Sequence, residues 1–178
     1  MIQLSNITYY PIKACRGFDV QASKVERMGL EHDRRMMVIT PAGEFLTQRE
    51  YPRLALVTPT LRLRSTTPAL AGGAREEHGL TPLSAKEMKN DWVTLSAPNF
   101  DSIQFGIQKS GTPTPVNIWK SKGVSAVDQG DESAQWLSDW LGVSVRLVHI
   151  ADGFKRKLNQ DYAINADDHT GFADGYPI

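Results

Sequence analysis

The sequence predicts a mainly β (α+β) fold, in which a small antiparallel β-barrel carries one packed helix. Three observations predict it. Up to residue 127, short segments rich in aliphatic and aromatic residues alternate with turn residues. The turns are short enough for hairpins, which make neighbouring strands antiparallel. With about ten short strands and no helix among them, closing the sheet on itself covers the strand edges and buries one face.

The expected strands are short and rich in apolar residues. They cover residues 2–9, 20–26, 34–40, 45–48, 54–57, 61–64, 92–96, 103–107, 116–120 and 124–127. Two turns between them are expected at Pro41-Ala42-Gly43-Glu44 and at Ser121-Lys122-Gly123. Residues 65–91 are instead small, polar and charged, without a sustained period, which predicts a long surface loop.

One helix is expected at residues 131–141, where Ala134, Leu137 and Leu141 fall on one face. Acidic residues suit its positive amino end, and Gly142 stands where a left-handed carboxyl cap forms. A further strand at 143–150 returns the chain to the sheet.

Two tryptophans, Trp136 and Trp140, lie four residues apart beside the apolar face of this helix. We expect at least one of them to pack the helix on the barrel, the alternative being a docking surface for a partner. The segment from Ala151 onward is rich in turn residues and is expected to connect two domains.

The bulk properties restrict the class of protein. The 20 basic and 20 acidic residues balance, so no global field attracts nucleic acid or an anionic membrane, and any anion site must be local. No run of about 18 apolar residues occurs, and no membrane span is expected. The single cysteine excludes an internal disulfide and fits a cytoplasmic protein. An OB-like nucleic-acid binder is a weak alternative, because no strand shows an aromatic–basic face.

Basic residues beside turns are the strongest chemical signal, because no metal-ligand spacing and no hydrolase or nucleotide-binding motif is found. Gathered at one end of a barrel, several would form a pocket for a phosphate or carboxylate. The alternative is solvated surface charge. Because adjacent strand residues face opposite sides, Arg34 and Arg35 cannot share a pocket without a bulge. The basic residues are Lys13, Arg16, Arg34, Arg35, Arg49 and Arg53.

Cys15 has two readings, a small buried hydrophobic residue or a redox group. Burial is the more common fate of a lone cysteine, so no catalytic role is assigned to it.

Several motifs together resemble the MOSC amino-terminal β-barrel family, which includes bacterial proteins that detoxify N-hydroxylated bases and the mitochondrial amidoxime-reducing component. They follow the family's order along nearly the whole chain. The motifs are YPIKACRG at 10–17, GL at 29–30, DRR at 33–35, FLTQR at 45–49, DQG at 128–130, AQW at 134–136, VRLV at 145–148 and FADGYP at 172–177.

The resemblance implies a molybdopterin-bound molybdenum centre that reduces N-hydroxylated substrates with electrons from a flavoprotein or iron–sulfur partner. It implies that Lys13 and Arg34 bind the phosphate end of this molybdenum cofactor. Ala14 replaces the serine common in the family, so only a backbone contact is expected there. Asp174, with Gly175 beside it, matches an aspartate near the cofactor.

The resemblance also implies two domains, a barrel domain at 1–150 and, at 151–178, a linker and the start of a truncated MOSC domain. The metal-ligating cysteine of the family lies in that following domain, so Cys15 is not expected to be the ligand. We therefore expect cofactor loading only in the full-length protein, no catalysis by this chain alone, and self-association through an uncovered interface. The missing MOSC domain, or a separate polypeptide that supplies it, is the expected partner. The alternative is a free-standing, non-catalytic barrel that binds the cofactor or a partner protein.

Overall fold

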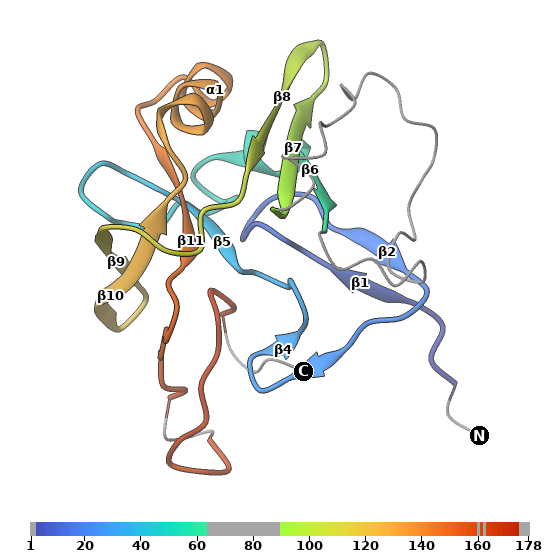
Figure 1. The fold of residues 1–178 in the computed structure, drawn as a ribbon, viewed down its shortest axis with the longest axis vertical. Helices are drawn as coiled ribbons and strands as arrows, with labels where there is room; N and C mark the ends of the chain where they lie inside the picture. Colours follow the sequence, from blue (N-terminus) through green and yellow to red (C-terminus); the bar gives the residue numbers. More distant parts are fainter. Residues whose placement is uncertain (1–2, 64–89, 160, 162, 175–178) are drawn as a thin grey trace.

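The computed structural model describes residues 3–63, 90–159, 161 and 163–174. Within these ranges the chain is mostly β, with curled antiparallel sheets that form a half-barrel and one α-helix packed on them (Figure 1). The mainly β prediction with a single packed helix is confirmed. Most of the loop expected at 65–91 lies outside the described residues.

The described elements follow one another as a series of short strands. The strands pair antiparallel in a four-stranded sheet, a three-stranded sheet and two hairpins, with the orders β5-β11-β10-β9, β6-β7-β8, β1-β2 and β3-β4. The elements are β1 (Ile7–Tyr9), β2 (Phe18–Val20), β3 (Val25–Glu26), β4 (Gly29–Leu30), β5 (Met36–Ile39), the 3₁₀ helix η1 (Pro52–Leu56), β6 (Thr58–Arg62), β7 (Trp92–Ala97), β8 (Phe100–Gly106), β9 (Pro113–Ile118), β10 (Ser121–Asp128), α1 (Asp131–Leu141) and β11 (Arg146–Ile150).

Strand β5 lies between two hydrophobic cores, because all of its side chains are apolar and successive ones face opposite sides. Met36 and Val38 enter a core shared with α1, β7 and β8. Met37 and Ile39 enter a second core that also holds Phe154 and Phe172. The chain after β11 therefore folds back over the far face of the four-stranded sheet and brings its last described residues toward β5.

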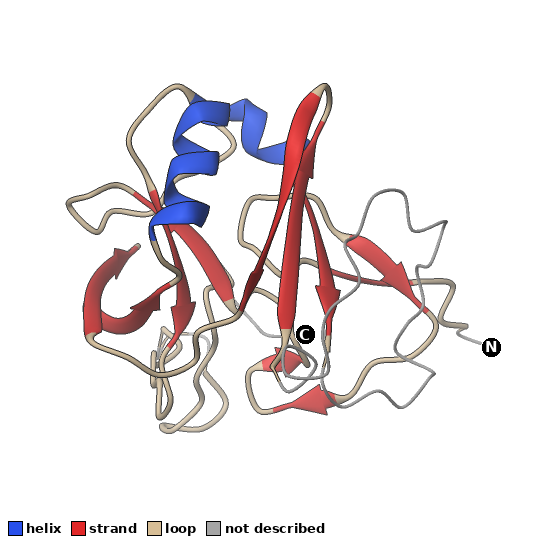
Figure 2. Ribbon diagram, turned by 45° about the horizontal axis from the view of Figure 1, so that its top comes forward, coloured by secondary structure: helices blue, strands red, loops and turns tan. Residues whose placement is uncertain are grey.

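Helix α1 has the bounds that the sequence predicts, and Gly142 ends it in the left-handed conformation with φ of +76°. Figure 2 shows the helix lying across the four-stranded sheet and reaching toward the β7-β8 hairpin. Trp136 and Trp140 are both buried, and their rings lie 5.3 Å and 5.5 Å from that of Phe100. The expectation that a tryptophan packs the helix on the barrel is confirmed. Among the described residues, no helix is long and apolar enough to cross a membrane.

Residues 54–57 form no strand, and this prediction is wrong. The segment is part of η1, which begins at Pro52, a residue whose ring fixes φ at a helical value. The amide of Leu54 donates to the carbonyl of Tyr51 at 3.0 Å, and the amide of Val57 donates to the carbonyl of Leu54 at 3.1 Å. Leu54 and Val57 are buried whereas Leu56 is 47% exposed, and a short apolar run does not distinguish such a tight helix from a strand.

The turn expected at residues 121–123 is also misplaced. These residues open β10. The chain reverses directly before them, at residues 119–120, where Trp119 adopts a φ of +52°. Gly123, with a φ of +62°, lies in an irregularity of the β9-β10 ladder between Ser121 and Val124. The strand expected at 45–48 is reduced to isolated bridges at Glu44 and Phe45.

Candidate functional site

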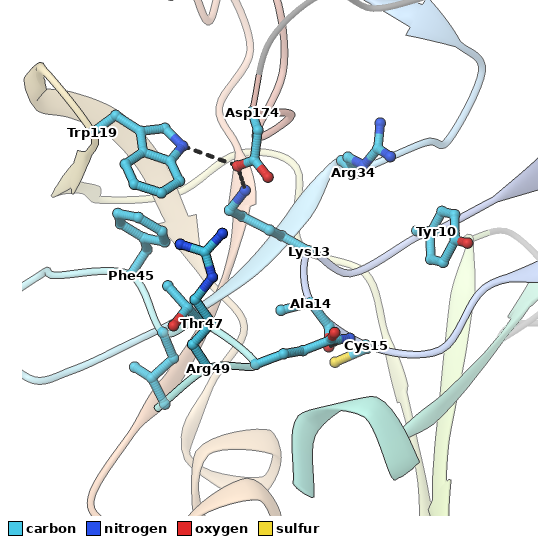
Figure 3. A pocket seen from close by; sticks show the side chains of 12 residues that line it. Tyr10, Lys13, Ala14, Cys15, Arg34, Phe45, Thr47, Arg49, Trp119 and Asp174 are labelled. Carbon is cyan, nitrogen blue, oxygen red and sulfur yellow. Dashed lines mark hydrogen bonds and ion pairs between the residues drawn. The ribbon is translucent and has the colours of Figure 1, made fainter. Parts of the chain in front are cut away.

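A pocket of about 310 Å³ opens where five separate segments of the chain meet (Figure 3). They are the turn after β1, the turn before β5, the loop that follows β5, the β9-β10 turn and the end of the described chain. Three of the lining side chains are cations and one is a carboxylate, so the pocket is predominantly basic. The lining residues are Tyr10, Lys13, Ala14, Cys15, Arg34, Phe45, Leu46, Thr47, Gln48, Arg49, Trp119 and Asp174.

Lys13 is the buried cation of the pocket. Its backbone amide donates to the carbonyl of Met36 at 2.8 Å, which fastens the turn after β1 to β5. The residue is 7% exposed, and its ammonium lies 5.5 Å and 5.9 Å from the ring centres of Phe45 and Trp119. Burial lowers the pKa of Lys13, and the hydrogen bond to Asp174 opposes that change. A buried ammonium of this kind requires an anionic partner.

Ala14 and Cys15 complete the same turn. Ala14 adopts a φ of +66°, and its carbonyl accepts a hydrogen bond of 2.8 Å from the side chain of Gln48. Cys15 is 1% exposed in the hydrophobic core, and burial raises the pKa of its thiol. The buried-hydrophobe reading of Cys15 is confirmed.

Arg34 reaches the pocket from the turn before β5, and not from the strand itself. Its φ is +48°, and its amide donates to the carbonyl of Tyr10 at 2.6 Å. The guanidinium pairs with Asp33 at 2.9 Å and stands 5.5 Å from the ring centre of Tyr10. Arg35 does not enter the pocket, and it pairs with Glu26 at 3.1 Å on the other side. The two arginines face apart as predicted, although a turn rather than strand pleating separates them.

Asp174 brings the end of the described chain onto Lys13. Its carboxylate accepts hydrogen bonds from the Lys13 ammonium and, at 2.9 Å, from the indole of Trp119 (Figure 3). Burial alone raises the pKa of Asp174, but the hydrogen bonds from Lys13 and Trp119 outweigh it and hold the pKa below its usual value. The carboxylate is therefore ionised near neutral pH and balances one pocket cation.

Arg156 holds the segment that carries Asp174. Its guanidinium is buried and donates to the carbonyls of Gly171 and Ala173 at 3.0 Å and 2.7 Å. The amide of Phe172 donates to the carbonyl of Arg34 at 3.1 Å. Two pocket segments that are far apart in sequence are thus joined by a backbone hydrogen bond.

The structure brings together Lys13, Ala14, Arg34 and Asp174, whereas Gly175 lies outside the described residues. Their binding roles remain predictions. In the sequence, Arg49 is only one of several basic residues beside turns, and nothing there singles out Trp119. Arg53, another of those residues, stacks on Trp140 at 4.0 Å and does not line the pocket. A strand was expected at residues 116–120, and this expectation hid the turn in which Trp119 lies.

The donor set suits one end of a phosphorylated cofactor. Lysine and arginine side chains around a small hollow are typical phosphate ligands. Among the described residues, no group of three histidine, cysteine or acidic side chains is arranged to hold a metal ion. The residues present therefore fit the phosphate end of a phosphorylated cofactor.

The fold and the site define a small β-barrel-type domain with a basic pocket at its turns. The comparison with protein families gives the same class of domain. The family described as MOSC N-terminal beta barrel domain matches residues 1–144, and the chain belongs to this family.

Curated relatives of two kinds match the chain. The chain is 28% identical to molybdenum cofactor sulfurase of Danio rerio over 155 residues, which is 87% of this chain and 16% of the relative. It is 27% identical to molybdenum cofactor sulfurase 3 of Aedes aegypti, over 89% of this chain and 18% of the relative. It is 26% identical to mitochondrial amidoxime-reducing component 1 of Danio rerio, over 98% of this chain and 48% of the relative. The chain spans less than half the length of these relatives.

Proposed function

We propose that this chain is the cofactor-phosphate-binding domain of a molybdenum-cofactor-dependent oxidoreductase that reduces N-hydroxylated compounds. The observation that carries the proposal is the convergence of Lys13 and Arg34 on one pocket. The names of the two kinds of curated relatives support the proposal. The sulfurases are named for the molybdenum cofactor, and the mitochondrial relative for the reduction of amidoximes, which are N-hydroxylated compounds.

The pocket residues would act electrostatically. The Lys13 ammonium, supported by the rings of Phe45 and Trp119, provides a fixed positive charge at the base of the pocket. Arg34, which lines the pocket beside it, adds planar donors that suit a phosphate oxygen pair. The bound cofactor would supply the two-electron reducing chemistry. The residues of this chain would orient it and hold its negative end.

The other components belong to the proposal as well. A MOSC domain, in the same polypeptide or a separate one, would supply the metal ligand and most of the substrate pocket. A flavoprotein or iron–sulfur protein would donate electrons, and the assembly would work in the cytoplasm. Under this proposal the 178-residue chain contributes contacts to the phosphate end of the cofactor, the cofactor is loaded in the full-length protein, and the chain alone turns over no substrate.

Binding of the cofactor tests the proposal directly. The full-length protein that contains this chain is incubated with molybdenum cofactor released from a donor molybdoenzyme, and the pterin that stays bound is quantified by fluorescence. We expect the Lys13→Ala/Arg34→Ala variant to bind at least about tenfold more weakly, because two charge-assisted contacts are lost. The Lys24→Ala/Arg27→Ala variant is the control, since it removes the same charge at exposed residues outside the pocket. Equal binding by all three proteins would contradict the proposal.

The coding DNA downstream of the codon for Ile178 distinguishes two hypotheses, a free-standing barrel and a component of an enzyme. A continuation with a cysteine in a MOSC-like domain supports the oxidoreductase component. A clean intergenic region favours the non-catalytic binding module, for which the same cofactor-binding assay remains the test.

A further inference from the structure

Arg49 is the pocket cation whose charge is not balanced by a carboxylate of the described residues. Lys13 is paired with Asp174, and Arg34 is paired with Asp33 at 2.9 Å. Among the described residues, the guanidinium of Arg49 has neither a hydrogen bond nor an ion pair, although it lines the same pocket. Figure 3 shows it pointing into the pocket, toward the side where Lys13 meets Asp174.

The backbone that carries Arg49 is nevertheless well held. The side chain of Gln48 donates to the carbonyl of Ala14 at 2.8 Å, which ties this loop to the turn of Lys13. The amide of Leu46 donates to the carbonyl of Val38 at 3.0 Å, and the amide of Tyr51 donates to the carbonyl of Thr47 at 2.9 Å. A fixed backbone with an uncommitted guanidinium is suited to a ligand that arrives from solution, because little ordering of the loop remains to be done on binding.

The geometry points to Arg49 as the principal bidentate ligand of a phosphate group in this pocket, with Lys13 as the second contact. An arginine presents two parallel N–H donors to a pair of phosphate oxygens, which a lysine cannot do. Neither of the two paired cations can offer its full charge unless its carboxylate moves away. Arg49 can bind an anion without that rearrangement. This inference rests on the proposed phosphate-binding function and adds a residue to which that function was not assigned.

The inference is tested by titrating the full 178-residue chain with inorganic phosphate at low ionic strength in a calorimeter. We expect Arg49→Ala to weaken binding by about tenfold or more. Arg49→Lys should recover only part of the loss, because it restores the charge without the fork. Arg27→Ala is the matched control, since Arg27 is 70% exposed and pairs at the surface with Asp167. Thermal unfolding of Arg49→Ala should match the wild type, because the side chain has no described partner to lose.

The possible outcomes separate this inference from the proposed function. If Arg49→Ala binds like the wild type while Lys13→Ala/Arg34→Ala does not bind, the role of Arg49 is overturned and the phosphate pocket stands. If only Arg49→Ala loses binding, Arg49 is the ligand, while the second contact by Lys13 and the proposed roles of Lys13 and Arg34 are overturned. If the wild type does not bind phosphate, or if Arg27→Ala weakens binding as much as Arg49→Ala, both proposals fail.

Discussion

The charge of the pocket is decided by a few single residues. The whole chain has a formal net charge of 0, yet three cations and one carboxylate line the same pocket. Lys13 is buried among aromatic rings, whereas Arg49 is exposed and uncommitted. The site is therefore a local concentration of positive charge, which overall composition does not reveal.

Asp174 competes with any anion for Lys13, and removing its charge should favour the anion. We expect Asp174→Asn to bind inorganic phosphate several-fold more tightly, by about 0.5–1 kcal/mol, because one like charge is removed from the pocket. The asparagine keeps an oxygen that can accept the hydrogen bonds from Lys13 and Trp119, so the segment should stay in place. Calorimetric titration measures the affinity. Weaker binding by this variant would show that Asp174 assists the anion rather than competing with it.

Turns, rather than strands, carry the site. Ala14, Arg34 and Trp119 all have positive φ values, in three separate turns that meet at the pocket. This backbone conformation directs side chains away from the alternation of a strand. The strand pattern therefore leaves the direction of these side chains open.

Gly43 in the turn after β5 should be sensitive to substitution, and Gly123 offers a matched control. Both have positive φ, +83° and +62°, but a Cβ at Gly43 would approach the carbonyl oxygen of Pro115 to 2.8 Å, whereas one at Gly123 meets nothing within 4 Å. We expect Gly43→Ala to lower the free energy of unfolding by about 2–3 kcal/mol and Gly123→Ala by about 1 kcal/mol. Urea denaturation measures both. Equal losses would mean that the contact with Pro115 is relieved by movement of the turn.

At the scale of the whole molecule, two cores share the four-stranded sheet. One lies under α1, and the other is closed by the chain after β11, through the rings of Phe154 and Phe172 at 5.4 Å. Arg156 fastens that closing segment, and the same segment carries Asp174. The segment after β11 therefore contributes to both the second core and the pocket. Self-association at high concentration stays a prediction.

The stability of the whole fold should depend on pH through His149, which is 8% exposed in β11. Burial lowers the pKa of His149 to about 4, against about 6.5 in the unfolded chain. Between these values the unfolded state binds more protons, so the free energy of unfolding falls as the pH falls. This contribution is fully present above about pH 6.5, and we expect a loss on the order of 2–3 kcal/mol by pH 4.

Urea denaturation at pH 7 and at pH 4.5 measures this dependence. The carboxylates titrate in wild type and variant alike, so the difference between the two proteins isolates the histidine. We expect His149→Gln to be less stable at pH 7 and to lose less stability on acidification than the wild type. Parallel losses in both proteins would remove His149 as the cause.

The sequence by itself determined the mainly β class, the bounds of α1 with its glycine end, and the motifs that carry Lys13, Ala14, Arg34 and Asp174. These features depend on local periodicity, capping and residue order, all of which can be read along the chain. Only the tertiary structure decided that Arg49 and Trp119 line the same pocket, and that residues 52–56 form a 3₁₀ helix. These depend on contacts between distant segments. The choice between a phosphate pocket and solvated surface charge depends on that convergence, which no local pattern encodes.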